Sequence, residues 1–229
     1  MLVQSCRGTF GSGASFRPME HETQDGLDTV AWLRTQQWFD GRLATVGASY
    51  LGFVQWALLM EPPPELKTAI VVVGPHDMHL NAWGTGSFSL DDFFGWSDMI
   101  VHQEEPGFLR GVRRQATSAK RLAPGMAGLP LLAAGEEILL GDAPWYGDWL
   151  NRPDGDDVFW APMKVAPRST GSRCRCCCSR LDGPVPRPDD GPVPAAAGTG
   201  RRGRADGGPW THIEVVGKGA RTVVPEQIA

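Results

Sequence analysis

Apolar and polar positions in the first part of the chain predict alternating strands and helices. Met1–Gln4 has the composition of a strand end, and from Asp25 apolar residues recur with helical spacing at positions 27, 30, 31 and 33. Leu43–Val46 is a short apolar strand, and the apolar run Tyr50–Met60 has the length of a helix that three prolines end. The β-branched run Ala69–Val73 predicts a buried strand. This order is typical of a parallel sheet covered by helices.

The rest of the chain divides by composition. Residues 81–150 carry many aromatic side chains without strand alternation and predict a helical insertion, and residues 151–165 lead back toward the sheet. Residues 166–207 are rich in Pro, Gly, Arg and Ala and hold too few large apolar side chains to offset their conformational entropy, which predicts disorder. We therefore expect a core formed by residues 1–80 and 208–229.

Charge and composition exclude several classes of protein. The 229 residues are 41% hydrophobic, enough for a real core, and the net charge of −4 gives no basic excess that would indicate nucleic acid. The longest apolar runs are far too short to span a membrane, and no signal peptide opens the chain. We therefore expect a cytoplasmic protein that binds neither nucleic acid nor membrane.

The sharpest local pattern is a serine between a strand and a helix. Ser49 follows the strand that runs into Gly47, and an apolar helix starts at Tyr50. Such a turn exposes the serine hydroxyl, and the backbone N–H of Tyr50 would be one oxyanion donor. The usual motif, Gly-x-Ser-x-Gly, has its second glycine where Leu51 stands, whereas here it comes one place later, at Gly52. A serine in a glycine-rich turn without catalytic function therefore stays an alternative at this point.

Longer stretches of sequence carry a family resemblance. The matching text is Val3-Gln4, Arg7-Gly8, Gly11-Ser12, Asp25-Gly26, Asp28-Thr29, Trp32-Leu33, Gln37-Trp38, Asp40-Gly41, Gly47 to Gly52, Gln55-Trp56, Phe159 to Met163 and Gly208-Pro209-Trp210-Thr211-His212. Together these segments resemble the Xaa-Pro dipeptidyl-peptidase/cocaine-esterase group of α/β-hydrolases. In that family the nucleophile motif is Gly-x-Ser-Tyr-x-Gly, which accounts for the late glycine.

The resemblance implies an α/β-hydrolase fold, with a mostly parallel sheet flanked by helices and a helical cap at residues 81–150. It also implies a serine hydrolase that cleaves esters or amides, including amides after proline, through an acyl-enzyme. Ser49 would attack the acyl carbonyl, and His212 would take the serine proton and return it to the leaving group. The expected partner is a small-molecule ester or amide, or a peptide; the sequence does not define the oligomeric state.

The chain also departs from the family pattern. The triad acid should follow an apolar strand roughly thirty residues before His212; Asp182 lies near that distance, but the sequence shows no strand before it, and Asp189 and Asp190 are less well placed. By this comparison the chain is truncated: it lacks an upstream tyrosine that supplies the second oxyanion donor, and Tyr146 falls in the expected cap. The alternative function is therefore a catalytically inactive hydrolase remnant that lacks the triad acid and the second donor.

The unusual segment has a simple explanation at the level of the coding DNA. Arg173–Cys178 is Arg-Cys-Arg-Cys-Cys-Cys, and one GC-rich encoding of it, read from the third base, gives Val-Pro-Val-Leu-Leu. That is the buried strand expected before the triad acid, so we hypothesise a frameshift from near residue 165 that is reversed near Gly208. The competing interpretation is a Cys/Arg-rich binding segment, although Cys-x-Cys-Cys-Cys lacks the Cys-x-x-Cys spacing of zinc sites.

Two further groups of residues leave alternatives open. His76 and His79 have the spacing of a metal-binding pair but show no third ligand, and a polar loop at the edge of the sheet is the alternative. We expect no metal and no cofactor. Four aromatic residues of the insertion either line an acyl pocket or fill its core, and the core is favoured for each: Trp83, Phe88, Phe93 and Trp96.

Overall fold

The computed structural model describes residues 1–165, 175–180 and 204–207, the last two ranges as backbone only. The described elements are, in chain order, α1 (Glu22–Leu33), β1 (Leu43–Ala48), α2 (Tyr50–Met60), β2 (Leu66–Val72), α3 (Met78–Trp83), α4 (Leu90–Val101), α5 (Phe108–Ala127), α6 (Leu131–Leu139), α7 (Pro144–Leu150), the 3-10 helix η1 (Val158–Met163), β3 (Arg175–Arg180) and β4 (Arg204–Gly207). They form two compact units. The sheet unit is Met19–Asp77 with Pro162–Ala229, and the helical unit is Met1–Pro18 with Met78–Ala161.

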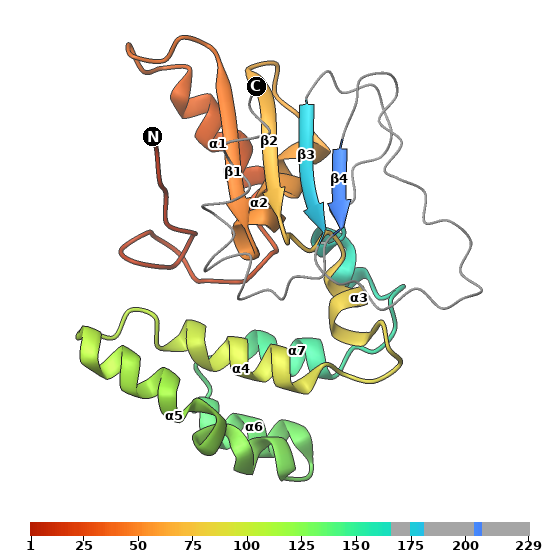
Figure 1. Cartoon of the computed structure of the whole chain (residues 1–229). Coiled ribbons are helices and arrows are strands. Elements are labelled where there is room, and N and C mark those ends of the chain that lie inside the picture. Colours follow the sequence, from red (N-terminus) through yellow and green to blue (C-terminus); the bar gives the residue numbers. More distant parts are fainter. Residues whose placement is uncertain (166–174, 181–203, 208–229) are drawn as a thin grey trace. The chain divides into compact units, whose positions relative to one another are not determined.

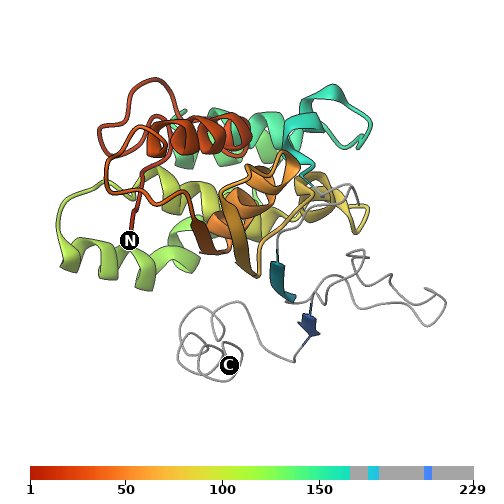
Figure 2. The same cartoon turned by 90° about the horizontal axis from the view of Figure 1, so that it is seen from above.

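The sheet unit is built on parallel strands in the order β1-β2-β3-β4 (Figures 1 and 2). The register places one row of residues across the carboxyl ends of all four: Ala48 pairs with Val72, Val72 with Ser179, and Ser179 with Asp206. Parallel neighbours need a crossover connection, and α2 makes the crossover from β1 to β2. Residues that follow these strands therefore leave the sheet at one edge.

Apolar side chains of α1 and α2 form the core of the sheet unit together with β2. Helix α2 covers the bounds that the apolar run predicts, whereas α1 begins three residues earlier than Asp25. Val30 and Leu33 of α1 are buried, which confirms the predicted apolar face. The buried core cluster of this unit is Val30, Leu58, Leu59, Leu66 and Ala69. Helix α2 therefore sits on β1 and β2 through aliphatic contacts, and α1 packs on α2.

Two glycines let α2 approach the sheet closely. A Cβ on Gly52 would lie 2.5 Å from Cα of Gly74 and 3.2 Å from the carbonyl oxygen of Val72. Carbon atoms in ordinary contact are about 3.5–4.0 Å apart, so the backbone of α2 and the chain beyond β2 meet where no side chain fits. The glycine that the common motif has at position 51 is thus needed at position 52 for packing.

The structure confirms the helical insertion predicted for residues 81–150, which the helices α3 to α7 of the helical unit cover (Figure 1). Its interior is aromatic. The rings of Phe93 and Trp149 pack edge to face with their centroids 5.1 Å apart, and Trp145 donates a hydrogen bond from Nε1 to the buried Ser97 hydroxyl. Trp83, Phe88 and Trp96 are half-buried and join the same network of rings. The interior packing proposed for these aromatic residues therefore matches their surroundings.

Three features differ from the expectations. Residues 1–4 form no strand, so that prediction is wrong. Residues 1–18 group with the helical unit and not with the sheet, since Phe16 packs edge-on against Trp145 at 5.3 Å and Arg17 pairs with Asp148. Strands β3 and β4 lie inside the segment 166–207, whose composition predicts disorder.

No helix in the described part of the chain has an apolar stretch long enough to cross a bilayer.

Candidate active site

Ser49 stands at the junction of β1 and α2 in a strained backbone conformation. Its φ of 58° and ψ of −121° are rare for any residue except glycine. Its N–H donates to the Val72 carbonyl oxygen (3.0 Å), and its own carbonyl accepts from Phe53 N–H (3.1 Å), so the backbone is held by the sheet on one side and the helix on the other. A Cβ on Gly47 would overlap the Leu51 carbonyl. The turn is therefore as tight as the small residues around the serine predict.

The side chain of Ser49 takes no part in capping the helix that it precedes. Serine at this position commonly accepts a bond from the first turn, yet no such side-chain bond forms here. The residue is half-buried. The hydroxyl therefore stays available for chemistry, next to a helix N-terminus whose partial positive charge favours a developing anion. Tyr50 is the first residue of α2, and the N–H groups of a first turn point out of the helix end.

A polar cluster fixes the Tyr50 side chain. Its hydroxyl accepts a hydrogen bond from Met19 N–H (3.1 Å) and donates one to Oε1 of Glu22. The other oxygen of Glu22 accepts from His21 N–H (3.0 Å). Met19 is itself held at a φ of 66°. The start of α1 is thereby joined to the start of α2 beside the serine.

Glu22 is buried, and its burial has an electrostatic consequence. Loss of solvent raises the pKa of the Glu22 carboxyl above its usual value of 4.5, although the hydrogen bond from Tyr50 acts in the opposite direction. A buried carboxylate is unfavourable unless it is hydrogen-bonded. The Tyr50 hydroxyl and the His21 N–H supply those bonds. The sequence does not single out this residue, because a glutamate at the start of a helix is ordinarily exposed, and the helix dipole stabilises its negative charge there.

The predicted base His212 and Asp182, a candidate for the otherwise unassigned triad acid, lie outside the described residues. The statement that no strand precedes Asp182 is wrong, because β3 ends at Arg180. An Arg/Cys-rich segment has no strand pattern of its own; it becomes a strand by pairing with β2 on one side and β4 on the other. Strand β4 ends five residues before His212. Both candidates thus follow strands of the sheet that also carries Ser49.

The remaining candidates have local explanations. His76 packs against Trp56 (ring centroids 6.2 Å), while His79 bonds to the Pro153 carbonyl oxygen at 2.9 Å. The described residues hold no group of three His, Cys, Asp or Glu side chains that suits a metal ion. Tyr146 is fully buried in the helical unit, where burial raises the pKa of its hydroxyl. The described surroundings of Tyr146 are those of a core residue.

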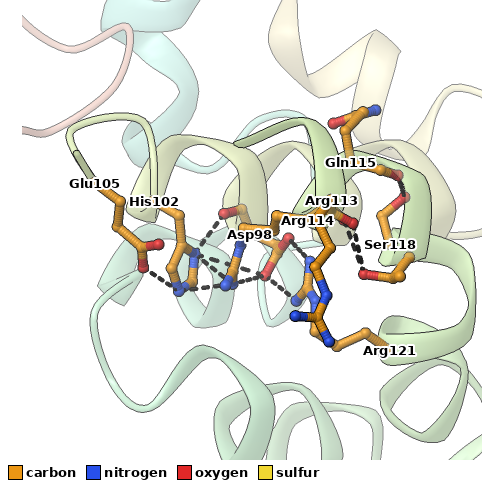
Figure 3. Close-up of polar contacts among 9 residues, drawn as sticks. Asp98, His102, Glu105, Arg113, Arg114, Gln115, Ser118 and Arg121 are labelled. Atoms are coloured by element: carbon orange, nitrogen blue, oxygen red, sulfur yellow. Dashed lines mark hydrogen bonds and ion pairs between the residues drawn. The ribbon is translucent and has the colours of Figure 1, made fainter. Parts of the chain in front are cut away.

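A second charged cluster lies in the helical unit (Figure 3). Asp98 of α4 is buried and accepts two hydrogen bonds of 2.6 Å from Arg121 and one of 2.8 Å from Arg114, both on α5. His102 lies beside Arg114, and the group lines a cavity of about 500 Å³. Burial opposes ionisation of Asp98, but the two guanidinium groups outweigh it and hold its pKa below the usual range. Asp98 on α4 is thus bonded to two arginines of α5, so we interpret the cluster as an ion-pair network that holds these two helices together.

Comparison with known proteins agrees with this architecture. Residues 1–179 match the model of the X-Pro dipeptidyl-peptidase (S15 family). The cocaine esterase of Rhodococcus sp. (strain MB1 Bresler) is 29% identical over 181 residues, which cover 75% of this chain and 31% of that protein. The crystal structure of an aminopeptidase from a marine sediment archaeon, Thaumarchaeota archaeon, superposes with a TM-score of 0.53 at 20% identity, covering 76% of this chain and 30% of that one.

The chain spans about a third of the length of both relatives. The structural likeness supports the α/β-hydrolase fold, and the match to the family model extends over more than three quarters of the residues, from the first residue through most of β3. The chain therefore belongs to the X-Pro dipeptidyl-peptidase (S15) family.

Proposed function

We propose that the protein is a serine hydrolase that transfers an acyl group from an ester or amide to water, with Ser49 as nucleophile. The Ser49 oxygen attacks the acyl carbonyl while His212 takes its proton, and the Tyr50 N–H donates to the oxyanion. His212 then protonates the leaving alcohol or amine, which leaves an acyl-enzyme. Water, deprotonated by His212, then attacks the acyl carbonyl; the bond to Ser49 breaks, the acid leaves, and His212 returns the proton to the Ser49 oxygen.

One observation carries this proposal: Ser49 occupies a strained conformation between a strand and a helix, with a side chain that caps nothing. A non-glycine residue at such φ and ψ costs about 1–3 kcal/mol, which persists only where the surroundings enforce it. An ordinary glycine-rich turn would place glycine at this position. The strain therefore favours the nucleophile over the alternative of a serine without function.

Chain geometry supports His212 as the base and Asp182 as the triad acid. Counted from the register row Ala48–Val72–Ser179–Asp206, Asp182 is three residues farther along the chain and His212 is six. An extended chain covers up to about 3.3–3.6 Å per residue, or roughly 10 Å and 20 Å. With strands about 4.8 Å apart, β1 lies roughly 10 Å from β3 and 14 Å from β4. The three and six residues that follow the two strands are therefore long enough to span these distances, which is what the proposed triad requires.

The names of the relatives support the proposed substrate class: they refer to an ester, to dipeptides ending in proline, and to peptide N-termini. All three reactions are acyl transfers, so an ester or amide of a small acyl group or short peptide is proposed for this chain. The larger part of the helical unit, Met78–Ala161, is inserted in the chain between β2 and β3, and we assign it the role of the family's cap. Fold alone does not select among these substrates.

The rival function is an inactive hydrolase remnant. The observation in its favour is that Tyr146 is a buried core residue of the helical unit, which argues against it as the second oxyanion donor; a missing donor typically costs 10²–10³ in kcat.

The deciding experiment is labelling of the purified chain with a fluorophosphonate, beside Ser49→Ala, His212→Ala and Asp182→Asn. Labelling that both alanine variants abolish and Asp182→Asn slows supports the proposed triad. A folded wild-type chain that takes no label supports the remnant.

A further inference from the structure

We propose that Glu22 and the Tyr50 side chain form a positioning pair that holds the backbone N–H of Tyr50 at the oxyanion of the acyl-transfer reaction. The inference rests on the proposed function, because it concerns the same site. Neither group touches the substrate in this scheme; both act through the backbone of Tyr50.

The Tyr50 hydroxyl is held from two directions. Met19 N–H donates to it, which turns its own proton toward Glu22, and Glu22 accepts that proton in a hydrogen bond. Rotation of the tyrosine would break both bonds at once. Because Tyr50 is the first residue of α2, locking its side chain also limits how its N–H can turn relative to Ser49.

The cluster also resists the strain on either side of it. Met19 and Ser49 both have positive φ values, 66° and 58°, and Tyr50 is bonded to the one and adjacent in sequence to the other. Strained residues keep their conformation only where neighbouring contacts determine it. A tyrosine anchored at its far end supplies such a contact, whereas phenylalanine would fill the same space without the two bonds.

The burial and hydrogen bonds of Glu22 fit a positioning role. It is buried, so it does not serve as a solvent-exposed charge at the helix start. Its two oxygens are used by the Tyr50 hydroxyl and the His21 N–H. A glutamine would keep an oxygen acceptor at the same point without a charge, whereas alanine would remove it. This difference makes the glutamine the conservative variant.

The test compares Tyr50→Phe, Glu22→Ala and Glu22→Gln with the wild-type chain, using p-nitrophenyl acetate turnover and the rate of fluorophosphonate labelling. Gln24→Ala is the matched control, since Gln24 is an exposed residue of the same helix that bonds only to Asp28 in the described part. We expect kcat and the labelling rate to fall about 10- to 100-fold in the phenylalanine and alanine variants. KM should change little, Glu22→Gln should recover most of the loss, and Gln24→Ala should match wild type.

Thermal unfolding of each variant is measured first, so that rates are compared on folded protein. A reactive wild type whose Tyr50→Phe and Glu22→Ala forms react equally fast overturns the positioning role and leaves the proposed function intact. The same conclusion follows if kcat falls but Glu22→Gln recovers none of it. A wild-type chain that does not react overturns the proposed function, and this inference with it.

Discussion

Replacement of Gly52 by alanine should separate packing at the serine turn from helix propensity. The new Cβ would stand 2.5 Å from Cα and 3.0 Å from N of Gly74. The contact with Cα is about 1 Å closer than carbon atoms approach without repulsion. The atoms that it meets are backbone, so α2 must move away from β2. Overpacking of this kind costs about 1–3 kcal/mol, and alanine regains about 1 kcal/mol of helix propensity. Since the contact is with rigid atoms, we expect a net loss of about 2 kcal/mol.

Gly26→Ala is the matched control, because Gly26 is a helical glycine of the same unit. Its Cβ would lie 3.4 Å from the flexible Cδ1 of Leu58, an ordinary contact, so helix propensity should make this variant equal to wild type or up to about 1 kcal/mol more stable. Urea unfolding followed by circular dichroism measures both. Fluorophosphonate labelling of the folded proteins should be slowed only by Gly52→Ala. Equal stability of the two variants would refute the close approach of Gly52 to Gly74.

Four other results are expected. Ser49→Gly should be about 1–2 kcal/mol more stable than Ser49→Ala in urea unfolding, because only glycine accepts a φ of 58° without strain; a less stable glycine variant would contradict the elbow geometry. Asp98→Ala should lower the stability of the helical unit by about 3 kcal/mol, since it leaves Arg114 and Arg121 without their shared carboxylate, whereas Asp91→Ala on the exposed side of α4 should change it little. The stabilisation from Asp98 should be present above its ordinary pKa of 3.8 and be lost as the pH falls through the lowered value. The pH dependence of the stabilisation from Glu22 has the opposite sign: because its pKa is raised, its contribution is greatest below 4.5 and declines as the pH rises through the folded value. Glu22→Gln should therefore flatten this part of the profile of stability against pH. An unchanged profile would place Glu22 in solvent.

The sequence by itself determined the local elements. The apolar run that three prolines end predicts α2 with its observed bounds, and small residues around Ser49 predict a tight turn between strand and helix. These features depend on side-chain periodicity and on the conformational range of neighbouring residues, which are local properties. The family resemblance added His212 through its motif and Asp182 through its distance from His212, and both remain predictions.

Only the tertiary structure decided the contacts between segments far apart in the chain. The strain at Ser49 is imposed by β2 and α2 together, and the burial of Glu22 depends on Tyr50, which lies 28 residues away. Strand β3 has no strand pattern of its own and forms by parallel pairing with β2. Likewise Asp98 and Arg121 each resemble an ordinary charged residue of an exposed helix face until α4 meets α5. The physical reason is common to all of them: burial and pairing depend on which surfaces meet, and the pattern of one segment does not contain its partner.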